Sequence, residues 1–172
     1  AHAKKLALEV HTPPGLPHIY GDPVRWKQIL LNLVSNAIKF SQRGEVRIVA
    51  SWQRQGDDSG ILEVDVKDEG PGIPSGIDEH IFERFFRAET VEHAGTDGTG
   101  LGLAISRSLA HAMGGRLVLK ESSSCGSVFR LSIPFRQASM EDPGSSSFLR
   151  TNPLSLKGYR ILLCEDNRMN IR

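Results

Sequence analysis

A stripe of polar side chains runs along one side of a segment that is otherwise apolar. The segment follows Asp22-Pro23, a pair that favours a helix start, and is predicted to be helical as far as Phe40. At about 100° per residue, five side chains fall within roughly one third of the circumference: Gln28, Asn32, Ser35, Asn36 and Lys39. Buried amides need partners. The stripe therefore either faces a polar cavity that holds a ligand or metal ion, or bonds to neighbouring backbone.

A carboxylate stands at the end of the predicted strand over residues 61–67. Three apolar residues occupy the alternate positions before Asp68, and therefore the same side of the strand: Leu62, Val64 and Val66. Asp68 is therefore expected to point toward the core, where protein donors or the N–H groups of a ligand must satisfy it. The loop Asp68-Glu69-Gly70-Pro71-Gly72-Ile73-Pro74 follows, and its two glycines allow a ligand to approach the backbone closely.

A glycine-rich run, Gly98-Thr99-Gly100-Leu101-Gly102-Leu103, opens a predicted helix over residues 101–113. Free N–H groups and the positive end of the helix dipole at such a start favour phosphate binding. The run does not match the dinucleotide fingerprint G-x-G-x-x-G, because Leu103 occupies the last position, and the P-loop pattern G-x-x-x-x-G-K-[ST] does not occur.

The composition narrows the class of protein. In 172 residues, 39% are hydrophobic and 24% charged, which is typical of a globular chain. A net charge of +1 argues against a duplex nucleic acid as partner. No apolar run is long enough to span a bilayer. The two cysteines, Cys125 and Cys164, indicate neither a disulfide framework nor a zinc site, and fit a reducing compartment.

The chain divides into three predicted parts: a domain over residues 1–136, a linker rich in Ser, Pro and Asn over residues 137–157, and a truncated further domain over residues 158–172. The strands expected in the first part span residues 5–10, 45–52, 61–67, 116–121 and 127–135, the last two forming a hairpin across a turn at residues 122–126. Residues 78–87 are predicted to form a short helix and residues 88–99 a polar loop.

The segments described above, in this order and at these separations, resemble the ATP-binding catalytic domain of sensor histidine kinases. Residues 28–40 resemble the N box of that family, residues 68–73 the G1 box, Ile81-Phe82-Glu83-Arg84-Phe85-Phe86-Arg87 the F box and residues 98–103 the G2 box. The presence of an F box and the particular residues of the N box favour the kinases over gyrase, Hsp90 and MutL. The resemblance implies an α/β fold, a two-layer sandwich with a mixed sheet and helices on one face.

The resemblance also implies a place for the base of ATP. Asp68 would accept a hydrogen bond from the adenine amino group. Gly72 would line the base pocket, and Gly70 and Ile73 would also belong to the ATP-binding site. In the predicted hairpin, Val128 stands where many relatives have Thr near the adenine.

Further roles are implied on the phosphate side. Asn32 would hold Mg²⁺, and Asn36 and Lys39 would contact the phosphates or the ribose. The phosphates would lie in a cradle formed by Gly98, Thr99, Gly100, Leu101 and Gly102. A lid over residues 75–97 would be anchored by Phe85 or Phe86. Lys39 and Arg87 would be the catalytic cations, with Arg87 near the γ-phosphate.

The implied reaction is transfer of the ATP γ-phosphoryl group to a histidine outside this chain, because none of its six histidines lies in the acceptor motif of the family. The expected partners are ATP, Mg²⁺ and the dimerisation and histidine phosphotransfer domain of the same parent protein. The implied location is cytoplasmic, with any membrane anchor in other parts of the parent.

The tail adds a second resemblance. Ile161-Leu162-Leu163-Cys164-Glu165-Asp166-Asn167 is similar to the first strand of a receiver domain, so the parent is expected to be a hybrid histidine kinase. Two alternatives remain open at this stage: a catalytically silent module that senses nucleotide or docks a partner, and an ATPase of the motor type from the same superfamily.

Overall fold

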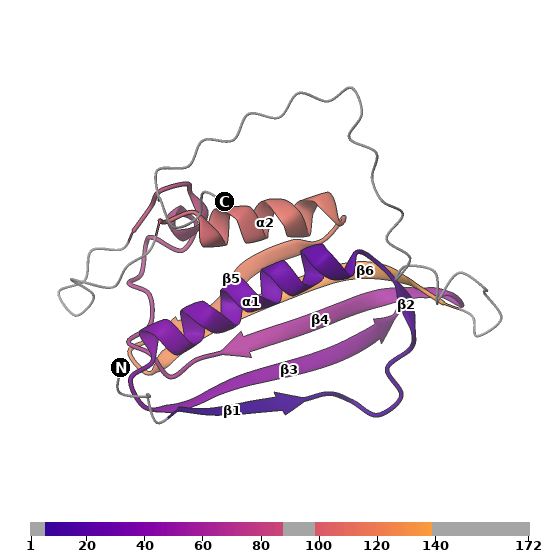
Figure 1. The fold of residues 1–172 in the computed structure, drawn as a ribbon, viewed down its shortest axis with the longest axis horizontal. Coiled ribbons are helices and arrows are strands. Elements are labelled where there is room, and N and C mark those ends of the chain that lie inside the picture. The colour runs from indigo at the N-terminus through magenta and orange to yellow at the C-terminus, as the bar shows by residue number, and fades with distance from the viewer. Residues whose placement is uncertain (1–5, 88–98, 139–172) are drawn as a thin grey trace, which may run out of the picture. The chain divides into compact units, whose positions relative to one another are not determined.

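The computed structural model describes residues 6–87 and 99–138, as a sheet with helices on one face (Figure 1). The strands follow the order β1-β3-β4-β6-β2, and β5 also pairs with β6. Their bounds are β1 Leu6–His11, β2 Ile19–Tyr20, β3 Gly44–Arg54, β4 Ser59–Lys67, β5 Arg116–Ser123 and β6 Gly126–Gln137. Since β1 is parallel to β3 and the other pairs are antiparallel, the sheet is mixed.

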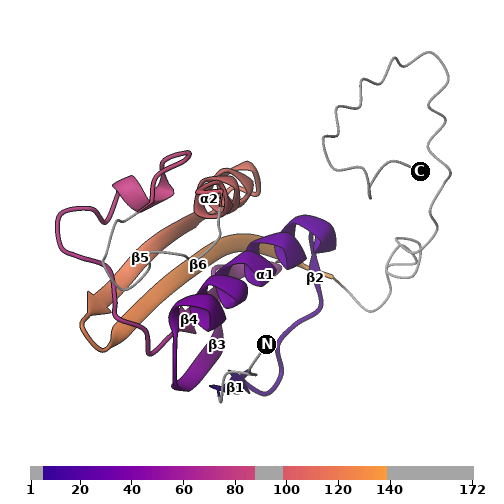
Figure 2. The ribbon, with the colours of Figure 1, turned by 60° about the vertical axis from the view of Figure 1, so that its left-hand side comes forward.

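The helices α1 (Pro23–Phe40) and α2 (Gly102–Ala112) lie side by side on the same face of the sheet (Figures 1 and 2). The core fills the space between these helices and the strands, with Ile29 and Leu33 of α1 packed over Leu117 and Leu131 of the sheet. The predicted two-layer α/β sandwich with helices on one face is therefore confirmed.

Local sequence signals placed α1 correctly. The side chain of Asp22 accepts hydrogen bonds from the backbone N–H groups of Val24 and Arg25, each at 3.0 Å. The apolar residues of α1 are not all buried, because Leu31 is 59% and Ile38 40% exposed. The helix buries only the side that meets the sheet.

The short helix predicted over residues 78–87 is wrong. The structure has only one 3₁₀ turn there, η1 (His80–Phe82). Beyond it, the backbone N–H of Phe85 donates to the carbonyl of Gly100 at 2.9 Å, and Phe85 has a left-handed φ of 65°. Pairing with the glycine-rich loop thus replaces the helical hydrogen bonds. The two-residue strand β2 was not predicted.

The sequence predictions that fall on residues 1–5, 88–98 and 139–172 lie outside the described residues. They include most of the polar loop, the linker beyond Ala138 and the similarity to a receiver domain. Within the described ranges, no helix is both long and apolar enough to cross a membrane.

Candidate functional site

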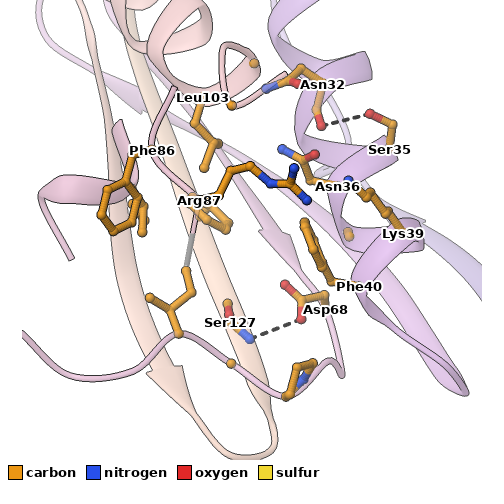
Figure 3. Close-up of a pocket in the computed structure, with 18 of the residues that line it drawn as sticks. Asn32, Ser35, Asn36, Lys39, Phe40, Asp68, Phe86, Arg87, Leu103 and Ser127 are labelled. Atoms are coloured by element: carbon orange, nitrogen blue, oxygen red, sulfur yellow. Dashed lines mark hydrogen bonds between the residues drawn. The ribbon is translucent and has the colours of Figure 1, made fainter. Parts of the chain in front are cut away.

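A cavity of about 430 Å³ lies between α1, the loop over residues 68–74 and the start of α2 (Figure 3). The polar stripe of α1 contributes four side chains to its wall: Asn32, Ser35, Asn36 and Lys39. Gln28, one turn earlier in the same stripe, is exposed and is not part of this wall. The stripe therefore faces a polar cavity over most of its length.

Asp68 lies at one end of the cavity, beside Ser127 (Figure 3). It directly follows β4, on the side of the strand that carries the core residues, and is only 7% exposed. Its Oδ1 accepts hydrogen bonds from the backbone N–H groups of Gly70 at 2.8 Å and Ser127 at 3.3 Å. Burial raises the pKa of Asp68, and these two hydrogen bonds offset part of that effect. Its Oδ2 has no hydrogen-bonding partner among the described residues.

Ser127, rather than Val128, lines the cavity. The backbone N–H of Asp68 donates to the carbonyl of Ser127 at 3.0 Å, which fixes β6 against the end of β4. Because side chains alternate along a strand, the neighbour Val128 points away from Ser127. The sequence resemblance named Val128 only as a departure from relatives that have Thr near the adenine, and it did not point to Ser127.

Asn32 lies at the other end of the cavity, where α1 meets α2. Its Nδ2 donates to the hydroxyl of Ser106 at 2.9 Å. A Cβ placed on Gly102 would lie 2.3 Å from its Oδ1, so only glycine allows α2 to approach this closely. The amide is thus held between two positions on α2.

Two cations enter the cavity from different elements. Lys39 comes from α1, with its Nζ 5.0 Å from the centroid of the Phe40 ring. Arg87 follows η1 and extends toward Asn36 (Figure 3). Asp68 is the one acidic residue among the described wall residues. The positive side chains make this part of the cavity suitable for an anion.

The glycine-rich loop completes the wall with Thr99, Gly100 and Gly102. Among the described residues, no side chain caps the start of α2, which leaves first-turn N–H groups available to an anion. A Cβ on Gly100 would approach the backbone of Phe85 to 2.8 Å. The loop is therefore packed closely against the segment that carries Arg87.

Some predicted site residues lie elsewhere. Gly70 and Leu101 do not line the cavity, although Gly70 hydrogen-bonds to Asp68. Phe85 is 71% exposed, and Phe86 lines the cavity in its place. Gly98 lies outside the described residues. The structure adds apolar wall residues to which the sequence analysis gave no role in the site, including Leu103 and Phe129.

Ser122 is a further residue that the sequence did not reveal, because it was assigned to a turn. It lies in β5, and its hydroxyl accepts from the N–H of Ile73 at 2.7 Å and donates to the carbonyl of Ile73 at 3.2 Å. Gly72 has a φ of 75°, and a Cβ there would lie 1.9 Å from the carbonyl oxygen of Ser123. The loop that forms the cavity floor is therefore fastened to β5.

Removing this hydroxyl is expected to loosen the loop. Ser122→Ala loses two hydrogen bonds, each worth about 1 kcal/mol, so affinity for ATP, the ligand that the sequence resemblance implies, should fall by roughly five- to thirtyfold. Isothermal titration calorimetry measures the change. Ser124→Ala, in the exposed turn of the same hairpin, is the matched control and should bind as the unmodified chain does. Equal affinities for all three proteins would contradict a role for Ser122 in holding the loop.

Comparison with known proteins assigns this mixed sheet, its two helices and the cavity between glycine loops to a family of ATPases. The sequence model of the family described as "Histidine kinase-, DNA gyrase B-, and HSP90-like ATPase" matches residues 21–137. The chain belongs to this family, and its relatives identify it as a catalytic domain of the histidine kinase type.

Two curated relatives are sensor kinases. The chain is 34% identical over 174 residues to the aerobic respiration control sensor protein ArcB of Escherichia coli (strain K12), covering 99% of this chain and 21% of ArcB. It is 32% identical over 169 residues to the autoinducer 2 sensor kinase/phosphatase LuxQ of Vibrio vulnificus (strain CMCP6), covering 97% of this chain and 20% of LuxQ. The chain thus spans about a fifth of the length of these relatives.

Solved structures agree with the assignment. Full-length ShkA in complex with AMPPNP matches with a TM-score of 0.68 and 37% identity, over 81% of this chain and 27% of ShkA. The catalytic domain of the histidine kinase ThkA, solved in a nucleotide-free form, matches with a TM-score of 0.59 and 31% identity, over 75% of this chain and 80% of that domain.

Proposed function

We propose that this chain binds Mg-ATP in the cavity between α1 and the two glycine-containing loops and donates the γ-phosphoryl group to a histidine outside the chain. The parent would be a hybrid histidine kinase with a dimerisation domain and a receiver domain. The observation that carries the proposal is that one cavity has two chemically different ends, a buried carboxylate at one and an uncapped helix start at the other, with the cations Lys39 and Arg87 in its wall. The related ShkA, solved with AMPPNP, supports a nucleotide ligand.

Asp68 is the residue assigned to the base. An ionised carboxylate only accepts hydrogen bonds, and its Oδ2 is without a partner among the described residues, so an exocyclic amino group can donate to it. Apolar wall residues near the loop, including Ile73 and Phe129, provide surfaces for the faces of a flat ring.

Asn32 is the residue assigned to the metal. Mg²⁺ prefers oxygen ligands and is commonly held by one or two protein oxygens together with substrate phosphates. In residues 6–87 and 99–138, no group of three or more His, Cys, Asp or Glu side chains could hold a metal alone. An amide oxygen beside the phosphates fits a shared metal, which, when bound, neutralises phosphate charge. Because Nδ2 bonds to Ser106, Oδ1 is the atom that would contact the metal.

Lys39 and Arg87 are assigned to the phosphoryl groups. Phosphoryl transfer depends mainly on positioning and on stabilisation of the charge on the transferred group. A cation from α1 and another from the segment after η1 would hold the terminal phosphate from two sides. The first-turn N–H groups of α2 would bind the remaining phosphate oxygens.

The isolated chain is expected to bind ATP but not to label itself with radioactive γ-phosphate. Transfer needs an acceptor placed in line with the γ-phosphate, and no histidine of the chain stands in an acceptor motif. Adding the dimerisation hairpin of its own parent should restore labelling on a histidine of that hairpin. The label should be labile in acid and stable in base, as a phosphoramidate is.

The outcomes separate the alternatives. Labelling of one of the six histidines of this chain would contradict the proposal. ATP binding without labelling of the added hairpin would favour a silent module that senses nucleotide or docks a partner. Dimerisation of the chain that depends on ATP would favour a motor-type ATPase.

A further inference from the structure

The hydroxyl of Ser106 lies at the contact between the two helices that enclose the phosphate end of the cavity. Ser106 belongs to α2 and is 1% exposed, and its Oγ accepts a hydrogen bond from Nδ2 of Asn32 at 2.9 Å. Asn32 belongs to α1 and lines the cavity. A buried polar group is thus paired with the side chain that is assigned to the metal.

The position of Ser106 on its helix explains the geometry. Ser106 follows Gly102 by four residues, so the two lie one above the other on the same face of α2. Gly102 leaves room beside Oδ1 of Asn32, where a Cβ would come within 2.3 Å. The oxygen of the amide therefore lies by Gly102 and its nitrogen by Ser106.

Orientation matters because a side-chain amide presents an oxygen or an NH₂ group depending on a half-turn about its last bond. Only the oxygen can contact a metal ion. In the structure the hydroxyl of Ser106 accepts a hydrogen bond from the nitrogen, and this bond holds the amide in the orientation that leaves the oxygen without a contact to Ser106. With alanine at position 106, the partly buried NH₂ group would lose its acceptor, and the orientation that presents the oxygen would lose the hydrogen bond that supports it.

We infer that Ser106 is a positioning residue for the metal: it holds the nitrogen of the Asn32 amide, which leaves the oxygen, beside Gly102 in the cavity wall, for Mg²⁺. The inference rests on the proposed function, in which Asn32 is the metal ligand. It assigns to α2 a second role beside the phosphate contacts of its first turn. The hydroxyl acts through Asn32 and not by touching the nucleotide.

Ser106→Ala is expected to weaken the apparent affinity for Mg²⁺, titrated at saturating ATP, by about tenfold or more, as loss of a residue that orients a metal ligand commonly does. Affinity for ATP in EDTA should stay unchanged, which also shows that the variant is folded. Ser108→Ala is the matched control, because it makes the same change at an exposed position of the same helix.

A double-mutant cycle with Asn32→Ala completes the test. If Ser106 acts through Asn32, Ser106→Ala should cause no further loss in the Asn32→Ala background. A loss that is equal with and without Mg²⁺, or that adds to the loss in Asn32→Ala, would overturn the inference and show a packing role. If Asn32→Ala removes the Mg²⁺ dependence and Ser106→Ala does not change it, the inference about Ser106 is wrong while the proposed metal role of Asn32 stands. If Asn32→Ala leaves that dependence intact, the proposed metal role fails as well.

Discussion

Replacement of Asn32 by alanine is expected to weaken binding of Mg-ATP by about 100-fold or more. Residues that merely orient a metal ligand commonly contribute 10- to 100-fold in metal affinity, so loss of the ligand itself should reach at least the upper figure. The fold should be preserved, because the amide lines the cavity and does not belong to the apolar core. Isothermal titration with ATP in the presence of Mg²⁺, and again in EDTA, measures the effect.

Gln28→Ala provides the matched control for this experiment. Gln28 lies one turn before Asn32 on the same stripe of α1, carries the same kind of amide and is exposed outside the cavity. It should bind Mg-ATP as the unmodified chain does. Unchanged Mg-ATP affinity in Asn32→Ala would refute the assignment of this residue to the metal.

GTP is expected to bind at least about 100-fold more weakly than ATP. Adenine presents an amino group where guanine presents a carbonyl oxygen, and Asp68 can only accept at that position while it is ionised. The wrong base would leave a buried carboxylate facing another acceptor, a mismatch that costs a few kcal/mol and gives strong discrimination. Competition of each nucleotide against a fluorescent ATP analogue measures the ratio. Equal affinities would show that Asp68 does not recognise the base.

Asp68→Asn tests the same residue with a side chain of nearly the same size and shape. The amide keeps an oxygen for the N–H groups of Gly70 and Ser127, but its NH₂ group can donate to the guanine carbonyl. Affinity for ATP should therefore fall and the preference over GTP should shrink. A variant that still prefers ATP by the original factor would contradict the assignment.

The raised pKa of Asp68 also predicts how this variant affects stability. Its pKa lies above the ordinary value of 3.8, because burial disfavours the charged form. The contribution of Asp68 to the free energy of unfolding is therefore greatest below that value, falls as the pH rises through the folded-state pKa, and stays at its lowest at neutral pH. Asp68→Asn removes that cost, so at neutral pH its thermal unfolding temperature should equal or exceed that of the unmodified chain.

The sequence alone determined those parts of the protein that depend on local periodicity and turn chemistry. Asp22 and Pro23 predicted the start of α1. The spacing of the asparagine side chains along this helix predicted that Asn32 and Asn36 lie on a common face. Strand alternation predicted that Asp68 points inward, and the structure confirms this. These signals succeed because each is carried by neighbouring residues on one element.

Tertiary structure decided the rest, because the remaining choices depend on partners far apart in the chain. Pairing of Phe85 with Gly100 prevents a helix after η1 and leaves Phe86, not Phe85, in the cavity. Ser127 and Ser122 gain their roles only because β6 and β5 lie beside the loop after β4. Ser106 meets Asn32 across 74 residues of sequence because glycine at position 102 lets α2 pack closely on α1. No local pattern of apolar and polar residues carries such long-range contacts.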